Sequence, residues 1–199
     1  MSITYTIKTK WNSLPINHRP VQITLSSIPS TNGILINIEA PLFSDPPSPT
    51  SEPGPTDKLW NYEVVEIMLL NSKTNHYLEL EFSPSGHYLV LFLNGRRNIV
   101  KHLLPLNYTV TCTNDSWSGI ADIPFDYFPK NIDRINCYAI YGSNEDRVYE
   151  ALYPVPLNKY SEPDFHRLEY FNNIDFKLLM INNHVNDQSE SKIWTENLS

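Results

Sequence analysis

The most constraining feature of the sequence is a series of short segments in which polar and apolar residues alternate, without sustained helical periodicity. Alternation with a period of two places the apolar side chains on one face of a β-strand. Turn residues such as Asn94-Gly95 separate the segments, and Asn-Gly is favoured in hairpins because both residues tolerate positive φ. These patterns predict an all-β antiparallel β-sandwich of about nine to eleven strands with short helical turns.

The segments 62–70 and 76–82 are predicted to form two adjacent central strands. In the first, Glu63 and Glu66 stand three residues apart and therefore point to opposite faces, about 10 Å apart along the strand. They do not form a carboxylate pair with each other. Glu66 can approach Glu79 or Glu81 on the neighbouring strand if the register allows it. Two interpretations of Glu66 stay open: a carboxylate anchored inside the sandwich, or a ligand contact.

The length of 199 residues favours a single domain, which we place at residues 1–181. Residues 41–57 form a proline-rich loop with six prolines, and proline lacks the amide hydrogen that helices and sheets need. The loop carboxylates Asp45, Glu52 and Asp57 could ligate calcium, although solvated charges are the favoured interpretation. From residue 182 the chain turns polar apart from Trp194, so 182–199 is predicted to be a disordered tail.

Composition excludes several classes of partner. The net charge is −7 and no basic stripe is present, which argues against nucleic acid. No segment approaches the roughly 20 apolar residues of a membrane span, and Met1–Lys8 lacks the apolar run of a signal peptide. We therefore expect a cytoplasmic protein without a membrane partner. In that compartment Cys112 and Cys137 are predicted to be buried free thiols. The sequence does not determine the oligomeric state.

Patterns that signal common catalytic or metal chemistry are missing. The six histidines do not show the spacing of a zinc site, and the chain contains neither a nucleophile motif of the G-x-S-x-G type nor a phosphate-binding loop. No catalytic residue, cofactor or metal ligand is therefore assigned, apart from the calcium alternative in the proline-rich loop.

Aromatic and polar residues gather at the predicted strand ends, as is typical of carbohydrate sites. An aromatic ring packs on the apolar C–H face of a sugar, while carboxylates, amides and arginines bond its hydroxyls. Trp60 precedes a central strand, and Arg96 follows a tight turn. The predicted ligand-binding residues are Trp60, Glu63, Glu66, Arg96, Arg97, Tyr149, Glu150, Asp164 and His166.

Five motifs closely resemble an uncharacterised protein family whose human member is an open reading frame on chromosome 4. The similarity spans most of residues 1–180, with the motifs in the same order. They are Leu-Trp-Asn-Tyr-Glu-Val-Val-Glu (59–66), Ser-Pro-Ser-Gly-His (83–87), Asn-Gly-Arg-Arg-Asn (94–98), Tyr-Glu-Ala-Leu-Tyr-Pro-Val-Pro (149–156) and Pro-Asp-Phe-His (163–166). This resemblance implies membership of a family and no particular activity.

A broader pattern is similar to family 9 carbohydrate-binding modules. It comprises a tryptophan-led strand with an acidic residue at 60–66, a Pro-x-Gly turn at 84–86, a tryptophan-to-proline strand at 117–124 and an Asp-Phe-His segment at 164–166. The resemblance implies the same β-sandwich, a site that holds sugar ends between aromatic rings, and structural calcium. Most such modules act outside the cell, which differs from the cytoplasmic location expected here.

Three functions remain as hypotheses, in order of preference. The first is a module that binds a carbohydrate or related polyhydroxylated small molecule. The second is a protein-interaction domain that uses an exposed edge strand and has no ligand. The third is a sugar-processing enzyme that uses Glu66, Arg96 or Arg97, and His166. The most informative observation is whether Trp60, Arg96, Arg97 and Glu150 converge on one concave pocket.

Overall fold

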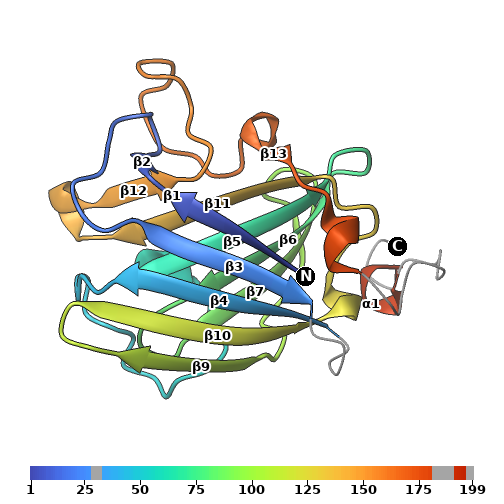
Figure 1. Ribbon diagram of the computed structural model, residues 1–199, viewed down its shortest axis with the longest axis horizontal. Helices are drawn as coiled ribbons and strands as arrows, with labels where there is room; N and C mark the ends of the chain where they lie inside the picture. The colour runs from blue at the N-terminus through green and yellow to red at the C-terminus, as the bar shows by residue number, and fades with distance from the viewer. Residues whose placement is uncertain (28–32, 181–190, 196–199) are drawn as a thin grey trace.

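Two antiparallel β-sheets pack face to face in the computed structural model, which describes residues 1–27, 33–180 and 191–195 (Figure 1). The smaller sheet has five strands in the order β1-β3-β4-β10-β9. Its strands are β1 (Ser2–Ile7), β3 (Val21–Ser27), β4 (Gly33–Pro41), β10 (Ser116–Pro124) and β9 (Asn107–Cys112).

The larger sheet has eight strands. Seven follow in the order β2-β12-β11-β5-β6-β7-β8, and β13 pairs with one end of β11. The strands are β2 (Thr9–Lys10), β12 (Val148–Ala151), β11 (Arg134–Tyr141), β5 (Val64–Asn71), β6 (His76–Phe82), β7 (Tyr88–Asn94), β8 (Ile99–His102) and β13 (Asn172–Asn173).

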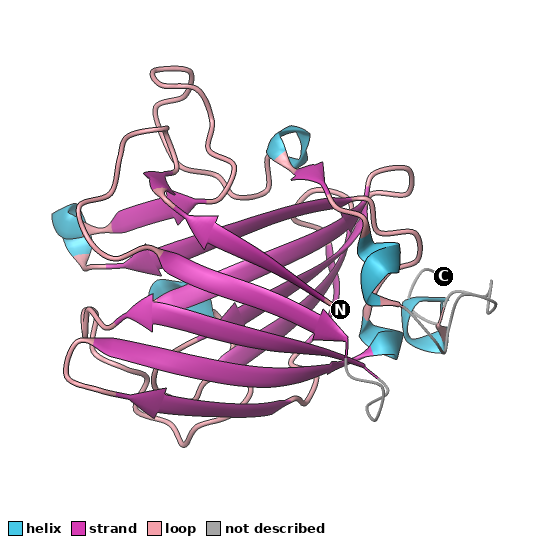
Figure 2. Ribbon diagram, in the orientation of Figure 1, coloured by secondary structure: helices cyan, strands magenta, loops and turns pink. Residues whose placement is uncertain are grey.

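The predicted antiparallel β-sandwich is confirmed, with thirteen strands in the described residues instead of about nine to eleven. The excess comes from β2 and β13, which have two residues each. Helices are short, as Figure 2 shows. They are the 3-10 helices η1 (Leu59–Asn61), η2 (Phe125–Tyr127), η3 (Asn144–Asp146), η4 (Leu168–Tyr170) and η5 (Phe176–Leu179), and α1 (Lys192–Thr195). No helix within the described ranges is long and apolar enough to cross a membrane.

The larger sheet is buried on both faces. On β5, Val65 and Ile67 point into the core between the sheets, while Val64 and Met68 point to the outer face, as the alternation predicts. That outer face carries a second apolar cluster, covered by residues 59–62 and 163–171. Central strands buried on both faces explain why β5, β6 and β7 are so apolar. The candidate site lies on this outer face.

Local structure departs from the prediction at two strand ends. The predicted strand 62–70 begins only at Val64, because Leu59–Asn61 form η1 after Lys58, which has a left-handed φ of 54°. The hairpin at Asn94-Gly95 is present but wider than a two-residue turn, since β8 begins only at Ile99. Within it Arg97 also has a positive φ, of 60°.

The C-terminal region is partly ordered, which corrects the predicted tail. Lys192–Thr195 form α1, and Trp194 is fully buried. Its ring stacks on Phe92 with centroids 4.4 Å apart, and its Nε1 donates a hydrogen bond to the Tyr127 carbonyl at 3.1 Å. Ile193 also packs against the core, and Ser191 Oγ donates a hydrogen bond to the Asp126 carbonyl at 2.7 Å. The predicted tail residues 182–190 and 196–199 lie outside the described residues.

The two cysteines differ in burial. Cys137 is a buried free thiol on β11, as predicted, but Cys112 is exposed. Cys112 ends the edge strand β9, whose burial alternates and whose last two residues face solvent. The proline-rich loop forms no regular element between Leu42 and Lys58, in agreement with its prolines.

Candidate functional site

A cavity of about 380 Å³ opens on the outer face of the larger sheet. Its floor consists of the side chains of Glu66, Glu79, Leu91, Leu93 and Ile140, from the adjacent strands β5, β6, β7 and β11. Its walls are the aromatic residues Trp60, Tyr149 and Phe165. Its rim consists of Arg97, Ile99, Pro163, Asp164 and His166. A volume of this size falls in the range of small-molecule sites, about 300–1,000 Å³.

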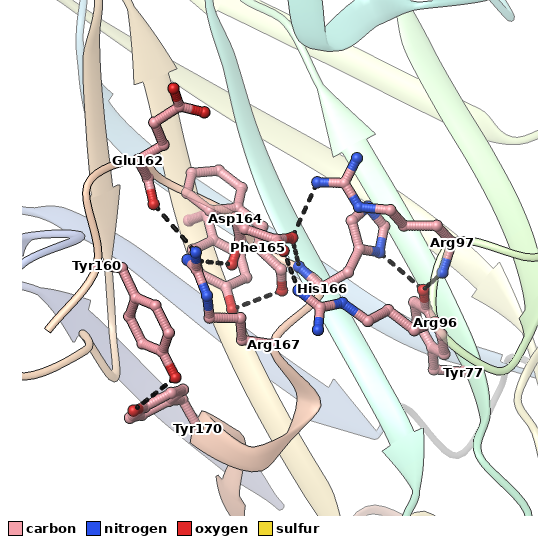
Figure 3. Close-up of polar contacts among 11 residues, drawn as sticks. Tyr77, Arg96, Arg97, Tyr160, Glu162, Asp164, Phe165, His166, Arg167 and Tyr170 are labelled. Atoms are coloured by element: carbon pink, nitrogen blue, oxygen red, sulfur yellow. Dashed lines mark hydrogen bonds and ion pairs between the residues drawn. The ribbon is translucent and has the colours of Figure 1, made fainter.

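Asp164 ties together two segments of the rim that are far apart in the sequence (Figure 3). Its carboxylate accepts hydrogen bonds from the guanidinium groups of Arg96 and Arg97, the latter at 2.9 Å, and from the His166 backbone N–H at 3.0 Å. Partial burial raises the pKa of Asp164, but the hydrogen bonds from Arg97 and Arg96 outweigh it and lower the pKa to about 2. Asp164 is therefore a carboxylate at neutral pH, bridging the β7–β8 hairpin to the 163–166 segment.

His166 is neutral and oriented by Tyr77. The Tyr77 hydroxyl accepts a hydrogen bond from the Arg97 backbone N–H at 3.1 Å and forms a second hydrogen bond with His166 Nδ1, 2.7 Å away. Burial, together with the nearby Arg97 and Arg96, lowers the pKa of His166 to about 4, although Asp164 opposes the shift. The positive φ of Arg97 is what points its amide at Tyr77.

Three carboxylates meet where Glu66 and Glu79 line the cavity, with Glu81 buried beside them. The antiparallel register of β5 and β6 pairs Glu66 directly with Glu81, and Glu79 lies two residues away on the same face. One carboxylate oxygen from each of the three lies within 4.8 Å of those of the other two. The exposed fractions of Glu66, Glu79 and Glu81 are 2%, 3% and 0%. The conditional prediction that Glu66 approaches Glu79 or Glu81 is therefore confirmed for both.

The surroundings favour the protonated form of these carboxyl groups. Burial raises the pKa of Glu79 to about 8, with Arg97 acting in the opposite direction. Burial, and then the charge of Glu79, raises the pKa of Glu66 well above its usual range. For Glu81, burial and the neighbouring Glu66 and Glu79 have the same effect. Sequence reasoning left Glu79 and Glu81 out of the site, although their alternation with Leu80 indicated that they share a face.

Arg147 holds the aromatic wall in place. Its guanidinium donates hydrogen bonds to the backbone carbonyls of Trp60, Asn61 at 3.0 Å, Tyr62 at 3.3 Å and Gly142 at 2.9 Å. These bonds fasten η1 to the turn after β11. The sequence did not predict this role of Arg147, because every residue has a backbone carbonyl. Which carbonyls accept hydrogen bonds from an arginine therefore depends on the fold.

Replacing Arg147 with alanine should lower the free energy of unfolding by about 2–3 kcal/mol, since a charged hydrogen-bond donor is lost from several carbonyls at once. Arg147→Lys should recover only part of the loss, because an ammonium group lacks the planar fork of the guanidinium. Urea denaturation of the three proteins measures both effects. A loss below about 0.5 kcal/mol for the alanine variant would show that the carbonyls are equally well solvated by water.

The structure brings six of the nine predicted site residues to the cavity: Trp60, Glu66, Arg97, Tyr149, Asp164 and His166. Arg96 is connected to it only through Asp164. Glu63 instead accepts the backbone N–H groups of Phe43 and Ser44, at 3.1 and 2.8 Å. Binding roles for the six remain a prediction.

Glu150 also lies away from the cavity. Its carboxylate is fully buried and contacts His18 Nε2 at 2.7 Å and the Tyr141 hydroxyl at 2.9 Å. The reason is strand geometry, since neighbouring residues Tyr149 and Glu150 of β12 point to opposite faces. The same rule separates Glu63 from Glu66.

Glu66, Glu79 and Glu81 are the one group of three or more potential metal ligands among the residues that the structure describes. The carboxylates of the proline-rich loop do not form such a group. Asp45 accepts a hydrogen bond from Ser143, and Asp57 lies 3.9 Å from His102.

Comparison with known proteins places the chain in a family. No protein-family model matches the sequence. A mouse protein, UPF0462 protein C4orf33 homolog, is 49% identical over 180 residues that cover 88% of this chain and 93% of the mouse protein. The human UPF0462 protein C4orf33 is 45% identical over 194 residues, or 96% of each chain. The chain belongs to the UPF0462 protein C4orf33 family. The zebrafish homolog, at 45% identity over 192 residues, extends the relationship to fish.

Membership of the C4orf33 family confirms the resemblance carried by the five sequence motifs. Among solved structures, a Bacteroides uniformis protein described as a "putative carbohydrate-binding protein" matches this C4orf33-family chain with a TM-score of 0.63 and covers 86% of it; the match covers 84% of the bacterial chain. The two sequences are 14% identical, so the likeness shows the fold alone.

Proposed function

We propose that this member of the C4orf33 family binds a carbohydrate, or a related polyhydroxylated small molecule, in the cavity on the outer face of the larger sheet. The observation that carries the proposal is the composition of the cavity: aromatic walls stand above a floor that ends in carboxyl groups. Sugars present the same two features, apolar C–H faces and a ring of hydroxyl groups. The fold shared with the Bacteroides protein supports the proposal.

The aromatic walls are held rigidly, which lowers the entropy lost on binding. Phe165 stacks on Tyr138 with centroids 3.9 Å apart, and the Tyr138 hydroxyl donates a hydrogen bond to the Phe165 carbonyl at 2.9 Å. The Arg147 guanidinium lies 5.9 Å from the centre of the Tyr149 ring. Trp60 is anchored through its carbonyl by the same arginine. A sugar ring would therefore meet preformed aromatic surfaces.

The polar groups complement hydroxyls in both directions. Neutral His166 has one ring nitrogen that donates a hydrogen bond and one that accepts. Because the pKa of Glu79 is raised to about 8 by burial, its carboxyl group is largely protonated at neutral pH and can donate one hydrogen bond and accept others. Arg97 adds a permanent donor at the rim. A ligand rich in hydroxyls satisfies such a mixed set better than an anion would.

Isothermal titration calorimetry with a panel of monosaccharides and short oligosaccharides, guided by a glycan array, tests the proposal. Trp60→Ala should weaken binding of the best ligand at least tenfold, or about 1.4 kcal/mol, because one wall is removed. Trp60→Phe should restore much of the affinity, since it keeps a ring. Glu39→Gln is the matched control, because Glu39 is exposed on β4 of the other sheet.

Two results would count against carbohydrate binding. One is the absence of heat and of array signal with every sugar tested. The other is a sugar affinity that Trp60→Ala leaves unchanged, which would place the ligand elsewhere on the protein. Product analysis of the same mixtures by chromatography reports on turnover, and conversion of a bound sugar would reassign the cavity to catalysis.

A further inference from the structure

We infer that Glu66, Glu79 and Glu81 form a binding site for a divalent cation that prefers oxygen ligands, at the floor of the cavity. The β5–β6 register holds the three carboxyl groups on one face of two central strands. One oxygen of each lies within 4.8 Å of the others. Glu66 and Glu79 line the cavity, so an ion can reach the group from solvent. The inference does not depend on carbohydrate binding.

The orphaned oxygen atoms of the group point to a ligand. Neither carboxylate oxygen of the fully buried Glu81 makes a hydrogen bond of good geometry, although the Trp60 backbone lies near enough to lower its pKa slightly. Oε2 of Glu79 also lacks a hydrogen bond, and His166 Nδ1 is 4.0 Å from it. Buried polar atoms in proteins nearly always have a partner. Three buried carboxylate oxygens without a hydrogen bond in one group are therefore explained by a ligand that binds to them.

When the three carboxyl groups are ionised, the species that fits them is a cation. The groups whose charges act most on Glu81 are Glu66, Glu79 and Asp57, all of them acidic. The arginines nearest the other two carboxylates are occupied elsewhere: Arg97 pairs with Asp164, and Arg147 binds backbone carbonyls. Because burial lowers the pKa of His166 to about 4, the imidazole does not supply the charge either. A bound cation would balance the carboxylates and occupy their free lone pairs.

The ligand set indicates the kind of ion. Three carboxylates without nitrogen or sulfur suit Ca²⁺, Mn²⁺ or Mg²⁺ rather than zinc. Two oxygens on one ion are separated by at most twice the metal–oxygen distance, which is roughly 5 Å for Ca²⁺ and roughly 4 Å for Mg²⁺. Spacings within 4.8 Å lie below the limit for Ca²⁺, so small adjustments of the side chains can bring all three oxygens to one ion. Mg²⁺ would bind all three oxygens only if every oxygen–oxygen distance were within roughly 4 Å.

Calorimetry on chelator-treated protein tests the inference, with CaCl₂, MnCl₂ and MgCl₂ titrated separately at pH 8. At least one ion should bind with one-to-one stoichiometry. Glu81→Gln and, independently, Glu66→Gln should each weaken that binding at least 100-fold, because each removes a charged ligand. Glu39→Gln on the other sheet should leave it unchanged. Circular dichroism of each variant verifies that the loss does not come from unfolding.

The pH dependence adds a second readout. Protons and the ion compete for the same oxygens, so affinity should rise at least tenfold between pH 6 and pH 8. The inference is overturned if none of the three ions binds at millimolar concentration at pH 8, or if both glutamine variants bind as tightly as the wild type. A sugar titration of the same samples separates the two proposals. Ion binding without sugar binding would contradict only the carbohydrate proposal. Sugar binding without ion binding would contradict only the cation site.

Discussion

Replacing Trp194 with alanine should lower the free energy of unfolding by about 3–5 kcal/mol, the usual cost of deleting a buried tryptophan. The side chain has no exposed surface. Its ring lies on Phe92, and the loss of its Nε1–H would leave the Tyr127 carbonyl without that donor. Urea denaturation followed by circular dichroism measures the change. The effect would be large for a residue so near the end of the chain.

Lys192→Ala is the control for Trp194→Ala, because Lys192 is exposed in the same short helix and should change stability by less than about 0.5 kcal/mol. A chain ending at Met180 measures the contribution of the whole C-terminal segment. If Trp194→Ala matches that truncation, the tryptophan accounts for the docking of the segment. A loss below about 0.5 kcal/mol for Trp194→Ala would instead support the frayed tail that the polar composition predicts.

Glu81→Met should have the opposite sign and raise the free energy of unfolding by about 1–4 kcal/mol at pH 8 in the presence of a chelator. Replacing buried charged groups by apolar side chains of similar size is often stabilising by that amount. Glu81 is fully buried, lacks good hydrogen bonds and faces two other carboxyl groups. A mutation that stabilises the protein while it removes a carboxylate would indicate that Glu81 is retained for binding.

The gain should shrink as the pH falls. A carboxyl group whose folded pKa is raised keeps its proton while the unfolded chain releases it, so stability falls as pH rises between the two pKa values, by about 1.4 kcal/mol per pH unit for one group. For Glu79 this interval runs from about 4.5 to about 8, and Glu66 and Glu81 shift in the same direction. Below the unfolded value the penalty is absent.

Denaturation of the wild type and of Glu81→Met at pH 5 and pH 8 therefore gives a larger difference at pH 8. Glu39→Gln, on the exposed face of β4, should show no such dependence. Destabilisation by Glu81→Met at both pH values would mean that the carboxyl group makes a compensating contact. With a bound divalent cation the wild type should gain stability that the variant cannot, which reverses the order of the two proteins.

Much of the sandwich follows from local sequence pattern. Alternation along β5 puts Val65 and Ile67 on one face and Val64 and Met68 on the other, and the structure places the first pair between the sheets and the second on the outer face. The same alternation showed that Glu63 and Glu66 cannot pair. These predictions succeed because a strand's side-chain direction depends only on its own backbone.

Prediction of the site was less complete, because it depends on which strands are neighbours. The meeting of Glu66 with Glu81 requires the β5–β6 register, and the joining of Arg97 to Asp164 spans 67 residues of sequence. Glu150 was wrongly predicted to share the site with Tyr149. Alternation along β12 puts these neighbouring residues on opposite faces of the sheet. The role of Arg147 depends on backbone carbonyl groups that the 3-10 helix η1 leaves accessible. No residue type in the sequence indicates their position.

The sequence by itself determined the strands, the family and six of the thirteen residues that line the cavity, because these depend on local alternation or on motifs that can be compared directly. Only the tertiary structure decided that three glutamates share one buried floor, that Asp164 joins two distant segments, and that Trp194 fastens the C-terminal helix to the sandwich. The physical reason is that long-range contacts arise from sheet register and side-chain burial, which individual stretches of sequence do not encode.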